Sequence, residues 1–330
     1  MTVPTTALRR RILLSLCCGT LGFGLPMTSI AQASYPSKPI RLIVAFAPGG
    51  GSDFIARLVA SKMSEKLGQP VIVENKPGAG GNMGATLALK SPADGYTLFL
   101  AAASYTVNPA LYKLPFDPIQ DITPVAQLAR GPFIVAVNPK LPATTVQEMI
   151  ALAKKSPGAL SYGSAGTGSI VHLVSEYFLD RTNTNMLHIP YRGTSPALVD
   201  AVAGQVQLVF GTVASTLPFI KSGQLKALAV TTETRLAALP QVPTLIESGL
   251  PDFAVTNWHG IIAPKGVPAD IVKKLNAVIN ESLQAPGMAE GLASDGLTAA
   301  GGSPQAFGIL LAEETKRWGA LVKKRGIKVE

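Results

Sequence analysis

The segment KPIRLIVAFAPGGGSDFIARLVA (residues 38–60) carries the clearest structural signal in the chain. It begins with a nearly continuous apolar run, which is typical of a strand buried on both faces of a parallel sheet. Three consecutive glycines follow. Apolar residues then recur at helical spacing from Ile55 to Met63, and Gly68 ends the pattern. The stretch therefore predicts a buried strand, a glycine turn and an amphipathic helix, with backbone N–H groups of the turn able to face an anion.

The same alternation of strand and helix continues along the chain. A second glycine-rich turn, SAGTGS at residues 164–169, again follows a strand-like run and precedes a helical one. Thr145 and Glu148 are spaced as a capping box at the start of another helix. Strands alternating with helices predict an α/β fold, a parallel sheet with helices on its faces. Further strands are predicted at residues 70–75, 96–103, 159–166, 186–191, 205–213, 224–232 and 258–264.

These elements divide into two units, each with one such glycine turn. The chain is predicted to enter the second unit near Asn138 and to return to the first near Trp258. We therefore expect a first lobe of residues 34–138 and 258–330 and a second lobe of residues 139–257. Because ligands of open α/β sheets bind at the carboxyl ends of the strands, we expect both glycine turns to face a cleft between the lobes.

The N-terminus predicts secretion. Arg9 to Arg11 precede an apolar run too short to span a bilayer, and AQA at residues 31–33 has the pattern of a cleavage site. We expect residues 1–33 to be a signal peptide that is removed. Both cysteines, Cys17 and Cys18, fall within this segment. Disulfides, thiol nucleophiles and thiolate metal sites are therefore not expected in the mature chain.

The composition is that of a globular protein and does not favour a nucleic-acid partner. Of the 330 residues, 47% are hydrophobic and 15% charged, which predicts a large buried core. The net charge of +9 includes the three leader arginines, and their removal leaves +6. The other basic residues are scattered and aromatic residues make up only 6% of the chain, whereas nucleic-acid-binding faces cluster basic and stacking side chains.

Three kinds of chemistry fit the motifs poorly. A dinucleotide site fails because Phe54 stands where a G-x-G-x-x-G motif starting at Gly49 needs its third glycine. A serine hydrolase lacks its G-x-S-x-G motif, although Ser169 and His172 lie one helical turn apart. The three histidines have no metal-ligand spacing. We expect no cofactor, no metal and no catalytic residue, and keep a secreted hydrolase-like enzyme as the alternative.

An anion receptor fits these turns better. Turns at residues 47–53 and 164–169 would each aim backbone N–H groups and a helix N-terminus into one cleft. Neutral hydroxyl donors stand in these turns at Ser52, Ser164, Thr167 and Ser169. Neutral donors suit a receptor, which must hold an anion and later release it. Asp53 is interpreted as support for the first helical turn in preference to a ligand contact.

Seven segments form an ordered set of motifs along the chain: YPSKPIRLIVAFAPGGGSDFIARLVA, VIVENKPGAGGNMGA, DGYTLFLA, NPALY, IPYRGTSPALVDAVAGQV, LKALAVTT and PQVPTLIESGLPDF. With these motifs the sequence resembles the tripartite tricarboxylate transporter substrate-binding proteins, the Bug-type periplasmic receptors of Gram-negative bacteria. The resemblance extends from about Tyr35 to the C-terminus.

This resemblance implies a type II periplasmic-binding-protein fold whose two α/β lobes close on a small carboxylate. The carboxylate is held by the two glycine-rich loops through backbone N–H groups and ordered water, without an arginine. The implied partners are membrane permease subunits or a sensor protein, and the receptor is expected to be a monomer. The implied ligand-binding residues are Phe46, Ala47, Gly49, Gly50, Gly51, Ser52, Asp53, Ser104, Tyr105, Ser164, Ala165, Gly166, Thr167, Gly168, Ser169, His172, Gly211 and Thr212.

One turn departs from the family pattern. Many relatives read Phe-Asp-Asn where this sequence has Phe210, Gly211 and Thr212. That acid can meet the amino group of an amino-acid ligand. The loss of the acid predicts a ligand without an amino group. Tyr105 and Trp258 are candidates both for contacting an elongated ligand and for packing the cleft wall.

Overall fold

The computed structural model describes residues 35–329, so the predicted signal peptide lies outside the described residues. Its strands are β1 (Ile40–Val44), β2 (Val71–Asn75), β3 (Thr97–Ala102), β4 (Ile122–Val137), β5 (Ser161–Ser164), β6 (Leu187–Pro190), β7 (Leu208–Thr212), β8 (Lys226–Val230), β9 (Thr256–Pro264) and β10 (Thr298–Gly301). Its α-helices are α1 (Gly51–Leu67), α2 (Asn82–Leu89), α3 (Asn108–Leu111), α4 (Val146–Lys155), α5 (Ile170–Thr182), α6 (Thr194–Ala203), α7 (Val213–Lys221), α8 (Ala269–Leu283), α9 (Met288–Ser294) and α10 (Pro304–Arg325). Every strand predicted from the sequence is present, whereas β4 and β10 were not predicted.

The strands form a mixed sheet, with parallel pairing at its two ends. β1 pairs in parallel with β2 and β3, and β5 pairs in parallel with β6 and β7. Between these groups run β9 and β4, which pair antiparallel with each other and with their neighbours, so the order is β2-β1-β3-β9-β4-β7-β5-β6. β8 and β10 also pair antiparallel with β4. The parallel pairing expected from the alternation of strands and helices is thus present in both outer groups, and the antiparallel strands at the centre were not anticipated.

β4 joins the two halves of the sheet. Its first part pairs with β9 and β10, and its last residues pair with β7 and β8. We call β1, β2, β3, β9, β10 and the helices on them the first lobe, and β5 to β8 with their helices the second lobe. The expected residue boundaries of the lobes remain a prediction.

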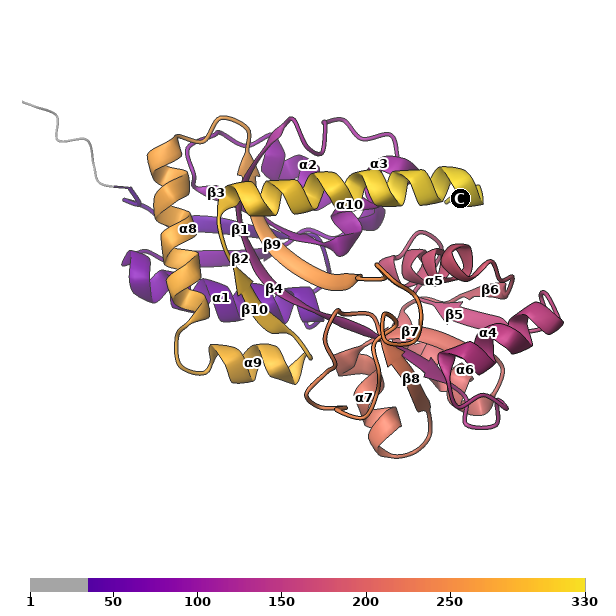
Figure 1. Ribbon diagram of the computed structural model, residues 1–330. Coiled ribbons are helices and arrows are strands. Elements are labelled where there is room, and N and C mark those ends of the chain that lie inside the picture. The colour runs from indigo at the N-terminus through magenta and orange to yellow at the C-terminus, as the bar shows by residue number, and fades with distance from the viewer. Residues whose placement is uncertain (1–34, 330) are drawn as a thin grey trace, which may run out of the picture. The chain divides into compact units, whose positions relative to one another are not determined.

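Each lobe carries helices on both faces of its strands (Figure 1). In the first lobe, one face packs against α1, α8 and α9, and the other against α2 and the start of α10. In the second lobe, α4 and α5 cover one face, and α6 and α7 cover the other. Apolar strands buried between two helical layers are what a doubly wound α/β arrangement requires.

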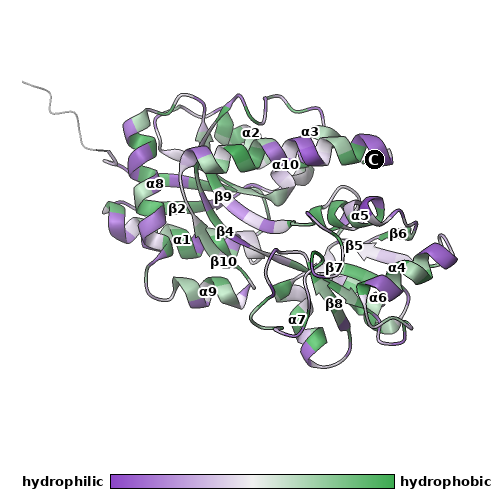
Figure 2. Ribbon diagram, viewed as in Figure 1, coloured by the Kyte–Doolittle hydropathy of each residue, from purple (hydrophilic) through white to green (hydrophobic). Residues whose placement is uncertain are grey.

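The C-terminal helix α10 packs on both lobes. Phe307 and Leu311, in its first half, belong to a core cluster of the first lobe. Trp318, Leu321 and Val322, in its second half, belong to the cluster beneath α4 and α5. The helix therefore spans from one lobe to the other before its hydrophilic C-terminal end, which is purple in Figure 2.

Local signals at helix ends behave as predicted. α1 starts at Gly51 and ends at Gly68, which adopts the left-handed conformation with φ of 65°. Thr145 and Glu148 form the capping box of α4. None of the helices in residues 35–329 is long and apolar enough to cross a membrane.

Candidate functional site

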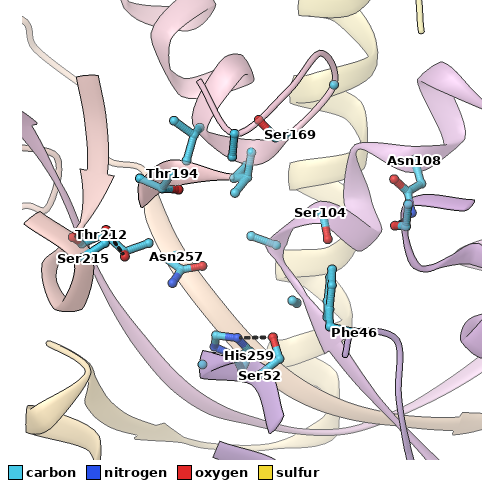
Figure 3. A pocket seen from close by; sticks show the side chains of 18 of the residues that line it. Phe46, Ser52, Ser104, Asn108, Ser169, Thr194, Thr212, Ser215, Asn257 and His259 are labelled. Carbon is cyan, nitrogen blue, oxygen red and sulfur yellow. Dashed lines mark hydrogen bonds between the residues drawn. The ribbon is translucent and has the colours of Figure 1, made fainter. Parts of the chain in front are cut away.

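A cavity of about 730 Å³ lies between residues of the two lobes, where the strands end. Its polar lining comes from segments that follow or end five different strands (Figure 3). These residues are Ser52 after β1, Ser104 after β3, Ser169 after β5, Thr194 after β6 and Thr212 at the end of β7. Asn257 and His259 of β9 line it as well. Five strands thus contribute at their carboxyl ends, as the rule for open α/β sheets predicts, and β9 contributes from its amino end.

Four helices, α1, α5, α6 and α7, begin at this cavity, because residues at their starts are among its lining residues. The first N–H groups of an α-helix have no partner within the helix. At the starts of α1, α6 and α7, the preceding residues Gly50, Gly193 and Thr212 make no side-chain capping hydrogen bond with the described residues. At α5 the Ser169 hydroxyl accepts a hydrogen bond from the His172 N–H. These helix N-termini, with the positive ends of their dipoles, favour an anion.

The side chains around the cavity are almost all neutral. Among the lining residues within 35–329, none is a lysine or an arginine, and Asp295 is the single aspartate or glutamate. Within that same range, no group of three or more His, Cys, Asp or Glu is placed to hold a metal ion. Any anion in the cavity would therefore be held by neutral donors and helix dipoles.

Asp53 holds the first glycine loop in place through hydrogen bonds of its carboxylate. Its Oδ2 accepts hydrogen bonds from the Gly49 N–H and from Arg57 Nε, both at 3.0 Å, and its Oδ1 accepts one from Asn75 Nδ2 at 2.9 Å. The hydrogen bond from Arg57 is the main reason that the pKa of Asp53 falls to about 2. Asp53 is buried and is not a lining residue, so its carboxylate orients the loop.

Two stacked histidines support the second glycine loop. His188 Nε2 lies 2.6 Å from the Ser164 hydroxyl, and His172 Nδ1 accepts a hydrogen bond from the Gly168 N–H at 3.1 Å. Because Nδ1 of His172 accepts, it carries no proton. Burial, followed by the neighbouring His188, lowers the pKa of His172 to about 4, and burial also lowers that of His188. Both rings are therefore neutral near pH 7.

The structure brings half of the predicted ligand-binding residues to the cavity. Those that line it are Phe46, Gly51, Ser52, Ser104, Ala165, Thr167, Gly168, Ser169 and Thr212. The others lie in the same loops or behind the wall, and they are Ala47, Gly49, Gly50, Asp53, Tyr105, Ser164, Gly166, His172 and Gly211. Ligand contact by the predicted residues remains a prediction.

Some of the residues behind the wall have packing partners that account for their position. The Tyr105 hydroxyl donates to the Pro118 carbonyl at 2.8 Å, and its ring packs near Phe116. Trp258 is fully buried, with its ring edge-on to Phe307. The structure thus gives both Tyr105 and Trp258 a packing role.

Other lining residues were not anticipated from the sequence. Their polar members are Asn108, Tyr112, Thr194, Ser215, Asn257, His259 and Asp295. Asn108 and Tyr112 begin and end the NPALY motif, which is the local signal that could have revealed them. Asn257 and Asp295 come from distant parts of the chain without a motif, and only the fold brings them to the cavity.

Two serine–histidine arrangements bear on the hydrolase alternative. At Ser169 and His172, the pair expected from spacing, the serine hydroxyl caps the helix and the imidazole accepts from a backbone N–H, so neither activates the other. Ser52 Oγ does lie 3.1 Å from His259 Nε2 in the cavity wall. However, His259 Nδ1 is buried without a hydrogen-bond partner among the described residues, so no acid orients this ring as in a triad.

Comparison with known proteins agrees with this geometry. Residues 55–327 match the model of the tripartite tricarboxylate transporter family receptor. Protein BugT of Bordetella pertussis is 37% identical over 314 residues, covering 94% of this chain and 95% of that protein. Rpa4515 of R. palustris, solved with adipate, is 34% identical with a TM-score of 0.77 over 89% of this chain and all of that one. MatC of Rhodopseudomonas palustris, solved with bound malate, is 31% identical with a TM-score of 0.73 over 87% and 100% of the two chains.

Proposed function

This chain belongs to the tripartite tricarboxylate transporter receptor family, and we propose that it is a periplasmic receptor that captures a small organic carboxylate in the cavity between its lobes. One observation carries the proposal. Uncapped helix N-termini and neutral hydroxyl groups surround a cavity without a basic side chain among the described lining residues. Such a site holds a carboxylate by directed N–H groups, which also permits its release.

The bound ligands of related proteins support the same chemistry. The R. palustris relatives were solved with adipate and with malate, both of them carboxylates. For this chain, we infer that the ligand binds the loops of residues 46–53 and 164–169 and that lobe closure follows as a population shift toward the state with more contacts. Residues 1–33 act as the signal peptide, and the closed receptor delivers its ligand as a monomer to membrane permease subunits or a sensor protein.

A thermal-shift screen followed by calorimetric titration tests the proposed function. The protein is dialysed into a buffer without carboxylates and mixed with mono-, di- and tricarboxylates, with the matching uncharged amides as controls. A ligand present at 100 times its Kd raises the free energy of unfolding by about 2.7 kcal/mol, so a specific carboxylate should raise the melting temperature while its amide does not.

Analysis of the ligand after binding distinguishes a receptor from an enzyme. After incubation with the protein, the ligand is recovered and analysed by mass spectrometry. A receptor returns it unchanged. Conversion of the ligand would support the hydrolase alternative, and the absence of binding by every carboxylate of the panel would contradict the proposed function.

A further inference from the structure

Asp295 places a carboxylate against the first glycine loop. It follows α9 directly and lines the cavity half-buried. A Cβ atom built on Gly51 would lie 2.8 Å from Asp295 Oδ2, so the missing side chain of Gly51 makes room for this carboxylate. The acid therefore stands beside the first turn of α1, at the loop that is proposed to hold the carboxylate of the ligand.

This carboxylate has no partner within residues 35–329. The side chain makes neither a hydrogen bond nor an ion pair there, although it is removed in part from solvent. Asp53, the acid within the first glycine loop, is by contrast paired with Arg57 and Asn75. A partly buried carboxylate without a donor is unfavourable, and burial raises the pKa of Asp295. A donor on the ligand would remove this cost.

The charge of the cavity limits which ligands can supply that donor. Asp295 is the acidic residue among the described lining residues, and no lysine or arginine stands with it. A negative or apolar ligand group next to Asp295 would leave the carboxylate unpaired. A hydroxyl or ammonium group would donate to it. Asp295 lies beside Gly51, which belongs to the loop that is proposed to hold the ligand carboxylate. The donor must therefore lie close to that carboxylate. A substituent on carbon 2 of the ligand, the carbon next to the carboxylate, has this position.

We propose that Asp295 is a specificity-determining residue that accepts a hydrogen bond from the 2-substituent of a 2-hydroxy or 2-amino carboxylate. The inference rests on the proposed function, because it assumes that the loops hold the ligand carboxylate. It also revises the expectation drawn from Gly211 and Thr212. The turn after β7 lacks an acid, but the turn after α9 supplies one to the same cavity.

Calorimetric titration with matched ligands tests the proposal. Two series are used, propanoate with lactate and alanine, and succinate with malate and aspartate. In each series one member has no 2-substituent, one has a hydroxyl and one has an ammonium group. The wild type should bind a substituted member at least ~10-fold more tightly than the unsubstituted one. A preference shared by both substituted members identifies a hydrogen bond, and a preference for the amino acid alone identifies an ion pair.

The variant Asp295→Asn keeps the size of the side chain and removes its charge. It should lose most of the preference for the 2-substituted ligand and keep, or improve, its affinity for the unsubstituted one. Asp270→Asn is the matched control, because Asp270 is exposed at the start of α8 and is not a lining residue. Circular dichroism and the melting temperature of each variant establish that it is folded.

The outcomes separate the two proposals. If unsubstituted carboxylates bind as tightly as substituted ones, or if Asp295→Asn keeps the wild-type preference, the assignment of Asp295 is overturned while the proposed function stands. If no carboxylate of either series or of the wider panel binds to the wild type, both proposals fail.

Discussion

The imidazole rings of His172 and His188 stack with their centroids 3.9 Å apart and their planes 10° apart. The pair lies behind the loop of residues 164–169, bonded to it through Gly168 and Ser164. Two charged rings at this separation would repel each other, and protonation of His172 Nδ1 would remove the acceptor of the Gly168 N–H. The stack thus ties the geometry of the second glycine loop to the neutral state of both histidines.

Stability should therefore fall in mild acid. The pKa of His172 is lowered to about 4 in the folded state, below its ordinary value of 6.5. The unfolded chain binds more protons in this interval, so the stabilisation is complete above pH 6.5 and is lost as the pH falls toward 4. The loss is about 1.4 kcal/mol per pH unit for each such group. Thermal unfolding between pH 7 and pH 5 measures it.

A comparison with His172→Asn isolates this contribution. The asparagine amide oxygen can take the place of Nδ1 as acceptor and does not titrate. Burial raises the pKa of Asp295 and of Glu314, so these two acids make the folded protein more stable as the pH falls. This effect opposes that of the histidines, but it is the same in the wild type and in the variant and cancels in the comparison. The variant should lose less stability than the wild type between pH 7 and pH 5, and equal losses would contradict the prediction.

The adjacent glycines Gly50 and Gly51 should respond differently to alanine. A Cβ on Gly51 would meet the Asp295 carboxylate at 2.8 Å, whereas a Cβ on Gly50 would meet nothing nearer than 3.8 Å. Gly50 has a φ of −85°, which any residue can adopt. Gly51→Ala should weaken binding of the preferred carboxylate by ~10-fold, and Gly50→Ala by less than about 2-fold. Equal effects in titrations of the two variants would show that Asp295 does not need this space.

The sequence predicted those elements whose pattern of apolar residues and glycines is complete within one short segment. The apolar run before Gly49 and the helical spacing after it predict β1, its turn and α1, and the same signals recur at β5 and α5. β4 was not predicted because Pro124, Gly131 and Pro132 interrupt its apolar pattern. The strand nevertheless continues through all three residues, and its register with β9 shifts after Pro124 and after Gln127.

The lining of the cavity could be predicted only in part, because some of its residues are brought together by contacts between distant segments. Backbone donors in glycine turns are visible in the sequence because the turns have a recognisable composition. Asn257, His259 and Asp295 reach the same space from β9 and from the turn after α9. Their position depends on how β9 pairs with β4 and how α9 packs on the first lobe, which are contacts between distant segments with no local pattern.

Alanine substitutions at Gly260, which packs against α10, and at Gly319, which lies within α10, should change the free energy of unfolding in opposite directions. A Cβ on Gly260 would lie 2.2 Å from Cζ of Phe307, so Gly260→Ala should lower the free energy of unfolding by about 1–3 kcal/mol through overpacking. Gly319 lies within α10 with nothing within 4 Å of a Cβ, so Gly319→Ala should raise it by about 0.5–1 kcal/mol. Urea unfolding of both variants measures the difference. Destabilisation by Gly319→Ala would contradict the packing of α10.

The end of α10 should be held to the second lobe mainly by Arg325. Its Nε lies 2.5 Å from Glu176 Oε2, and Glu176 Oε1 accepts a hydrogen bond from the Tyr162 hydroxyl. Arg325→Met would leave a buried carboxylate without its cation, which should cost roughly 2 kcal/mol, below the value for a fully buried pair because the Arg325 side chain is 28% exposed.

The neighbouring pair of Lys324 and Asp180 provides the matched control. Lys324 lies one residue earlier, and its side chain is 67% exposed, so Lys324→Met should cost less than about 1 kcal/mol. Combining Arg325→Met with Glu176→Gln removes the uncompensated charge and should restore part of the stability. If denaturant unfolding shows equal losses for the two single variants, the buried carboxylate of Glu176 does not depend on Arg325, and the prediction is wrong.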